Sequence, residues 1–157
     1  MKQFNIRVYG ILINEQQQVL VSDELIRGQY FTKFPGGGLE LGEGTRDCLK
    51  REFMEEMDLA VEVLDHLYTT DFYQPSAFNP EQQIISIYYK VKPLEEITAR
   101  LSNTVFDFNH EQLERYKIRN EIETFRFIDW NDLSEESVTL PIDKVVVRLL
   151  KSSTHLF

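Results

Sequence analysis

Three glutamates in one short segment, Glu52, Glu55 and Glu56, are the residues of this chain best suited to chemistry. On a helix with about 100° per residue they share one arc of roughly 100°. Like charges at these spacings repel each other by about 0.2–0.5 kcal/mol per pair. A solvated surface tolerates that cost, whereas a divalent cation exploits it, because Mg²⁺ takes carboxylate oxygens together with water and substrate phosphate. The segment is therefore either a metal-binding arc or an acidic surface.

A run of glycines, Gly36–Gly38, precedes the acidic segment. Because glycines have no side chains, their carbonyls and amides can approach a metal or a phosphate closely. Glu43 follows in the same stretch, and Arg51 can pair with a carboxylate and fix its orientation. With Pro35 in front of it, the run is too rich in breakers for regular structure, so we expect a loop.

The helix that carries the glutamates is expected to have Thr45 as its N-cap and Asp47 in its first turn. Leu49, Phe53 and Met57 recur at i, i+4 and i+8 and form one apolar stripe. This stripe adjoins the acidic arc. The carboxylates are therefore expected at the edge of the core, not on the far side of the helix.

The rest of the chain alternates strand and helix patterns. Strands are expected over residues 4–13, 19–21, 59–68, 84–91 and 125–128, and a closing helix over 142–151, with Pro141 at its start. Residues 93–120 are the least regular, and 94–101 and 111–116 are either short helices or parts of an irregular excursion. This order predicts an α+β fold with a mixed sheet covered on both faces. No linker divides the chain, so we expect a single domain over residues 1–157.

Composition excludes several functional classes. The 157-residue chain has a formal net charge of -9, and it lacks the clustered Lys and Arg of a nucleic-acid interface. No apolar run approaches the ~20 residues that span a bilayer. The first five residues show neither the h-region nor the cleavage site of a signal peptide, so we expect none. The single cysteine, Cys48, cannot form an intrachain disulfide and is expected to pack in the core rather than act as a nucleophile. We expect a cytoplasmic protein with neither nucleic-acid nor membrane partners.

The stretch from Gly37 to Leu59 resembles the box of the Nudix hydrolase family. That box reads G-x5-E-x7-R-E-U-x-E-E-x-G-U, where U is a bulky apolar residue. The chain supplies, at the required spacings, Gly37, Glu43, Arg51, Glu52, Phe53, Glu55, Glu56 and Leu59. Asp58 stands in place of the last glycine of the box. Because Asp adopts left-handed backbone more readily than most residues, we expect a local adjustment and no loss of chemistry.

The resemblance implies a Nudix-type α/β/α sandwich with a central mixed β-sheet, and a pyrophosphohydrolase that depends on Mg²⁺, with Mn²⁺ as a substitute. Its metal ligands would be Glu52, Glu55, Glu56 and the carbonyl of Gly36. Glu52 would also deprotonate or orient the water, Arg51 would hold the glutamates, and Glu43 would support the loop–helix contact. Some family members place the base in a later loop, for which the candidates are Glu81, Glu111, Glu114, Glu121 and Glu123.

The sequence gives weaker evidence about the substrate. Pro75 lies 16 residues after Leu59, a spacing near which family members that cleave ADP-ribose often carry a proline. Tyr73 could stack on a base, and Arg27 and Lys33 could bind phosphate. We expect the substrate to be a small nucleotide, and ADP-ribose or a nucleotide sugar is the first candidate. The alternatives are removal of pyrophosphate from a (d)NTP and a ligand sensor without catalysis. Related enzymes are often homodimers, so that state stays open.

Overall fold

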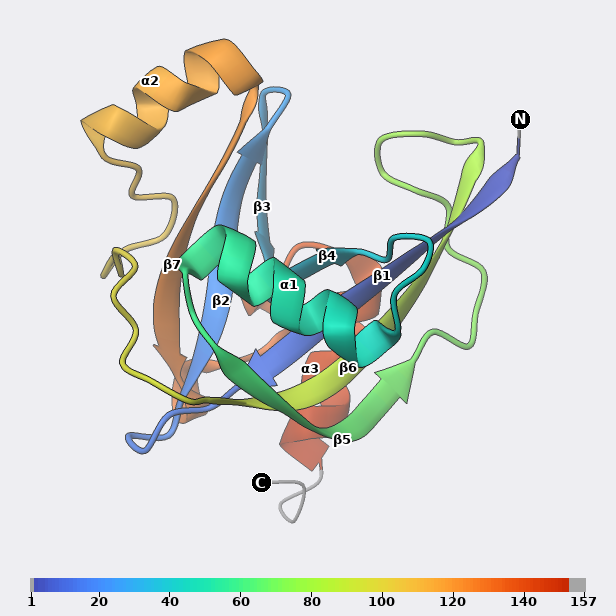
Figure 1. Cartoon of the computed structure of the whole chain (residues 1–157), viewed down its shortest axis with the longest axis horizontal. Coiled ribbons are helices and arrows are strands. Elements are labelled where there is room, and N and C mark those ends of the chain that lie inside the picture. The colour runs from blue at the N-terminus through green and yellow to red at the C-terminus, as the bar shows by residue number, and fades with distance from the viewer. Residues whose placement is uncertain (1, 153–157) are drawn as a thin grey trace. The chain divides into compact units, whose positions relative to one another are not determined.

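The computed structural model describes residues 2–152, which Figure 1 draws as a coloured ribbon. Its elements fall into two units that interleave along the chain. One unit comprises Met1–Leu12 and Pro35–Thr98, and the other comprises Ile13–Phe34 and Ala99–Phe157. The described residues contain three α-helices and two β-sheets, which confirms the expected α+β class. No helix within residues 2–152 is long and apolar enough to cross a membrane.

The first unit is built on a four-stranded sheet with the order β4-β1-β6-β5. Its strands are β1 (Gln3–Leu12), β4 (Gly36–Gly38), β5 (Val61–Thr69) and β6 (Gln82–Pro93). The central pair, β1 and β6, is parallel, whereas β4 and β5 each run antiparallel to their neighbour. This is the mixed sheet that the sequence predicts.

The expectation that the glycine run is a loop was wrong. Gly36–Gly38 forms strand β4, which pairs with β1 through Tyr9 opposite Gly36 and Arg7 opposite Gly38. Local propensity disfavours glycine in strands, but the edge of β1 supplies hydrogen-bond partners that no sequence window reveals. The glycines therefore form an edge strand of the sheet.

Helix α1 (Thr45–Met57) crosses one face of this sheet (Figure 1). The expected stripe is buried, and Phe53 packs so closely that a Cβ at Gly10 of β1 would lie 2.8 Å from its ring. The N-cap expectation was wrong, because Thr45 is the first helical residue and Gly44, at the N-cap, makes no side-chain cap. At the other end, Asp58 adopts left-handed backbone with φ 50°, which is the local adjustment we expected.

The second unit is built on an antiparallel sheet with the order β3-β2-β7. Its strands are β2 (Gln18–Ile26), β3 (Gln29–Lys33) and β7 (Glu121–Asp129), and its helices are α2 (His110–Arg119) and α3 (Pro141–Ser152). Two 3₁₀ turns, η1 (Trp130–Asp132) and η2 (Glu135–Ser137), precede α3. Of the two stretches left open between a short helix and an irregular excursion, residues 111–116 lie within α2, whereas residues 94–101 contain no helix.

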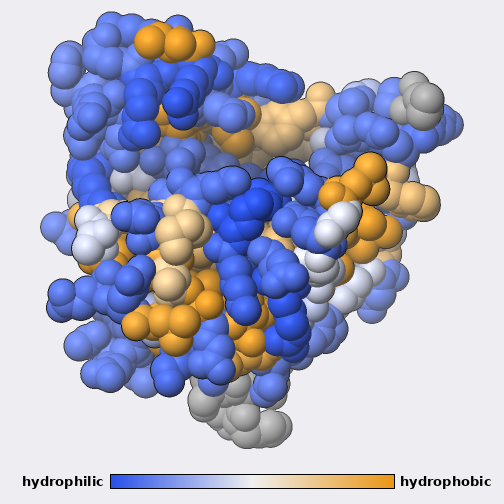
Figure 2. All heavy atoms as spheres, in the orientation of Figure 1, coloured by the Kyte–Doolittle hydropathy of each residue, from blue (hydrophilic) through white to orange (hydrophobic). Residues whose placement is uncertain are grey.

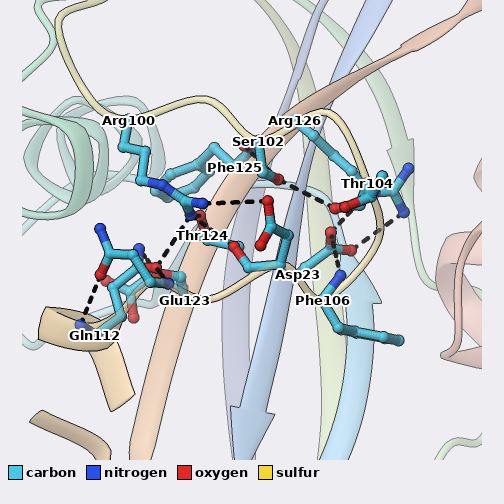
Figure 3. Close-up of polar contacts among 12 residues, drawn as sticks. Asp23, Arg100, Ser102, Thr104, Phe106, Gln112, Glu123, Thr124, Phe125 and Arg126 are labelled. Atoms are coloured by element: carbon cyan, nitrogen blue, oxygen red, sulfur yellow. Dashed lines mark hydrogen bonds and ion pairs between the residues drawn. The ribbon is translucent and has the colours of Figure 1, made fainter. Parts of the chain in front are cut away.

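A buried carboxylate organises the polar interior of the second unit (Figure 3). Asp23 on β2 is 0% exposed and receives hydrogen bonds from Arg126 Nε at 2.6 Å and from Thr32 Oγ1 at 2.7 Å. The backbone N–H of Phe106 also donates to it, at 3.2 Å. Phe106 belongs to an irregular segment, so the carboxylate anchors that segment to the sheet.

Replacing Asp23 with alanine should lower the free energy of unfolding by about 3–5 kcal/mol, because the variant leaves a largely buried Arg126 without its counter-ion. Urea denaturation would measure this loss. The matched control is Glu135→Ala, which breaks an exposed ion pair with Arg148 and should change stability little. Equal effects of the two substitutions would contradict the anchoring role of Asp23.

Candidate active site

Arg51 on α1 joins the glycine strand, the following loop and the acidic arc. Its Nε and Nη2 atoms donate to the two carboxylate oxygens of Glu43 at 3.0 and 2.7 Å, a bidentate pair. Nη2 also donates to the carbonyl of Gly38 at 3.0 Å. Nη1 donates to Glu52 at 3.0 Å and to Glu55 at 3.2 Å. One guanidinium thus fixes two glutamates of the arc relative to β4.

Electrostatic interactions keep both members of the Arg51–Glu43 ion pair charged. The hydrogen bond from Arg51, assisted by the backbone N–H of Glu40, lowers the pKa of Glu43 to about 2. The same bond with Glu43 raises the pKa of Arg51 above its usual value. Both partners therefore remain ionised at neutral pH, and the pair connects the loop to the helix.

Because Gly37 has no side chain, it leaves the space that the Glu52 carboxylate occupies. A Cβ at Gly37 would lie 2.5 Å from the carboxylate of Glu52, far closer than any side chain permits. The Glu52 side chain is only 12% exposed, whereas that of Glu55 is 57% exposed. The Glu52 carboxylate is therefore largely buried against the backbone of Gly37, whereas the Glu55 carboxylate is exposed to solvent.

Cys48 lies under the same region and does not supply a nucleophile. The residue is fully buried, and its thiol lies 3.5 Å from the carbonyl of Gly38. Burial, and then the neighbouring Glu43 carboxylate, raise the pKa of the thiol to about 12. The thiolate is therefore absent at neutral pH, which confirms that Cys48 packs in the core.

The acidic arc has the chemistry of a hard-cation site. Within residues 2–152, no three His, Cys, Asp or Glu side chains are gathered as a metal site, and Glu52 and Glu55 are instead paired with Arg51. The donors are nonetheless carboxylate oxygens from a single helix face beside glycine backbone, the kind of ligand that Mg²⁺ prefers. Surface residues on the face drawn in Figure 2 are mainly hydrophilic. The donor set thus fits a hydrated divalent cation.

Among the later glutamates, Glu123 stands apart. Glu81, Glu111, Glu114 and Glu121 are exposed, whereas Glu123 on β7 is half-buried. It lies directly opposite Glu24 of β2 in the antiparallel register. Burial, and then the Glu24 carboxylate, raise the pKa of Glu123, against the opposing effect of Arg115 and Arg119.

This shift predicts a pH-dependent stability. The unfolded chain loses the Glu123 proton near the ordinary pKa, and the folded chain loses it at higher pH. The protein therefore loses stability as the pH rises through that interval. Glu123→Gln cannot ionise, so its stability relative to the wild type should be greater at pH 7 than at pH 4 in urea denaturation. Glu121→Gln, at an exposed neighbour, is the control, and the same difference at both pH values would contradict the prediction.

The expected substrate residues are divided between the units. Tyr73 and Pro75 lie in the exposed loop between β5 and β6, in the same unit as α1. Arg27 and Lys33 belong to the second unit, where Arg27 occupies the exposed β2–β3 turn. The ammonium of Lys33 lies 2.9 Å from Glu24 and is mostly buried. A phosphate at Lys33 would thus compete with this carboxylate, a partner that sequence spacing did not indicate.

Comparison with known proteins supplies the family. The sequence model of the family described as NUDIX domain matches residues 3–149. A comparison with curated proteins gave no significant match. Several solved structures have a similar fold. The E. coli ORF135 protein is 14% identical with a TM-score of 0.68, and the alignment covers 96% of this chain and 91% of that one.

Two further structures carry functional names. A MutT NUDIX hydrolase from Burkholderia pseudomallei is 14% identical, with a TM-score of 0.67 and coverage of 95% of this chain and 99% of that one. An ADP-ribose pyrophosphatase from Streptococcus suis 89-1591 is 16% identical, with a TM-score of 0.53 and coverage of 96% and 94%. At these identities the likeness shows the fold, and it confirms the expected Nudix-type architecture.

Proposed function

The chain belongs to the Nudix family of pyrophosphohydrolases, and from this premise we propose that it uses Mg²⁺ to split the diphosphate bond of a nucleoside diphosphate linked to another group. The observation that carries the proposal is the set of hydrogen bonds from Arg51, which hold Glu52 against Gly37 and bring Glu55 to the same side of α1. We further propose that the two interleaved units form one Nudix domain, because neither is a continuous segment of the chain.

Glu52, Glu55, Glu56 and the Gly36 carbonyl would hold the cation. When bound, Mg²⁺ would neutralise the diphosphate and lower the pKa of a bound water. Without cations, a chain with a net charge of -9 would repel its own anionic substrate. Mn²⁺ has similar ligand preferences and would substitute.

The chain's own residues would then divide the remaining work. Glu52 is sheltered and adjoins bare backbone, so it would accept the proton of the attacking water or orient that water. Arg51 would act as a positioning residue, because its donors are directed at Glu43, Gly38, Glu52 and Glu55. Glu43 would keep Arg51 in place, since its pKa of about 2 leaves it ionised throughout the working range.

ADP-ribose or a nucleotide sugar is the substrate class that we propose first. The position of Pro75 supports it, and the exposed ring of Tyr73 in the same loop could stack on a base. Arg27 and Lys33 are proposed phosphate contacts. The similar folds of a MutT hydrolase and an ADP-ribose pyrophosphatase leave removal of pyrophosphate from a (d)NTP as the second candidate.

Product analysis separates these candidates. The protein would be incubated with Mg²⁺ and ADP-ribose, sugar nucleotides, dinucleoside polyphosphates or (d)NTPs, beside a Glu55→Gln/Glu56→Gln control. AMP with ribose 5-phosphate would support the first class, and a nucleoside monophosphate with pyrophosphate the second. Turnover in excess EDTA would refute the metal dependence. Binding without turnover across the panel would favour a ligand sensor.

A further inference from the structure

The N-terminal turn of α1 is fastened to the sheet by a tyrosine instead of a local cap. Gly44 makes no side-chain cap, but the hydroxyl of Thr45 lies 2.7 Å from that of Tyr89 on β6, and either can donate. Tyr89 is only 8% exposed. The adjacent guanidinium of Arg46 lies 4.8 Å from the centre of the Tyr89 ring. The first turn of the helix thus has its partner on a strand far away in sequence.

Neighbouring contacts hold Tyr89 and the helix in register. The ring of His66 on β5 packs edge-on against Tyr89, with 5.8 Å between the ring centres. Arg46 also donates to the carbonyl of Val63 on β5 at 2.8 Å. On its other side, Tyr89 is paired with Gly10, the residue that leaves room for Phe53 of α1. Tyr89 is therefore held by residues of β1 and β5, and the start of the helix is held to β5.

The position of α1 along its own axis matters for the acidic arc. Glu52 fits against Gly37 with less clearance than one methyl group. A shift of the helix by a fraction of an ångström would move that carboxylate relative to β4. Arg51 fixes the middle of the helix through the Gly38 carbonyl, and the Tyr89–Thr45 contact fixes its start.

We propose that Tyr89 is a positioning residue whose hydroxyl, through Thr45, sets the placement of the metal-binding glutamates on α1. The inference rests on the proposed function for its metal. It adds Tyr89, a residue outside the box, which acts on the arc through Thr45, seven residues before Glu52. Tyr89 touches no reacting atom in this scheme. Its contribution is a fixed helix register, which a preformed metal site requires.

The test removes single hydroxyl groups. Tyr89→Phe and Thr45→Val each delete one partner, Thr45→Ser keeps the hydroxyl, and the double variant Tyr89→Phe/Thr45→Val deletes both. The control is Tyr68→Phe, which removes a tyrosine hydroxyl from β5 that bonds to Asp71 instead of to α1. Mn²⁺ alone is the probe, and its affinity is measured by electron paramagnetic resonance on the whole chain.

We expect Tyr89→Phe and Thr45→Val each to weaken Mn²⁺ binding about three- to tenfold, and the double variant to be no worse than either single one, because all three lose the same bond. Thr45→Ser and Tyr68→Phe should stay within twofold of the wild type. Equal Mn²⁺ affinity of Tyr89→Phe and Tyr68→Phe would overturn the inference.

Hydrogen exchange separates this inference from the proposed function. If the wild type bound no Mn²⁺, the metal-dependent function would fail, and the exchange rates of the α1 amides would then decide the role of Tyr89. Exchange at Cys48 and Leu49 should be at least fivefold faster in Tyr89→Phe than in Tyr68→Phe. Unchanged exchange at those amides would refute the positioning role.

Discussion

Glu52→Gln is expected to reduce kcat by about 10²–10⁴-fold, the range that a positioned general base contributes. The amide has nearly the same shape as the carboxylate, so it should still fit against Gly37. It cannot accept the proton of the attacking water, and it removes one anionic ligand from the proposed metal site. Initial rates with saturating Mg²⁺ would measure the loss, and urea denaturation would show whether the fold is intact.

The matched control for this substitution is Glu40→Gln. Glu40 also approaches Arg51, at 3.7 Å, but its side chain is 67% exposed and it lies outside the helix arc. It should retain nearly full activity. If Glu52→Gln stayed within tenfold of the wild type, the base and the main metal ligand would have to lie elsewhere, and Glu123 would become the first residue to test.

Gly37→Ala should abolish most activity while leaving the catalytic groups in the sequence. The added methyl would lie 2.5 Å from the Glu52 carboxylate, so this side chain must leave its position. Misplacing a reacting group by about 1 Å can cost ~10²-fold in rate, and we expect a loss of that order. Steady-state kinetics would show the effect mainly in kcat, because the displaced group acts in the chemical step.

Gly44→Ala is the control for the glycine substitution. A Cβ at Gly44 would have Asp47 Oδ2 as its nearest neighbour, at 4.0 Å, and φ is -79°, which suits any residue. Its activity should stay close to that of the wild type. Comparable losses in both variants would mean that the whole segment from β4 to the start of α1 is sensitive, and that the contact between Gly37 and Glu52 has no special role.

The box spacing was sufficient to predict α1 and its buried stripe, because helical periodicity depends on residues three and four apart. The same locality explains why the left-handed residue at Asp58 and the closing helix after Pro141 were found. The family followed from the same segment, since its eight matching residues lie within 23 positions. Local spacing therefore determined the candidate catalytic helix and the class of chemistry.

Tertiary structure decided the features that depend on distant partners. Gly36–Gly38 became a strand because β1 offered it hydrogen bonds, against its local propensity. Thr45 bonds to Tyr89, 44 residues away, instead of capping its own helix. No local pattern singles out Asp23, whose role in the fold comes from the hydrogen bonds that Arg126 and Phe106 donate to it. The local spacing of residues determines which side chains a helix presents on one face. Strand pairing, side-chain burial and the space around each side chain arise only when segments remote in sequence come into contact. These contacts fix the positions of the side chains in the site.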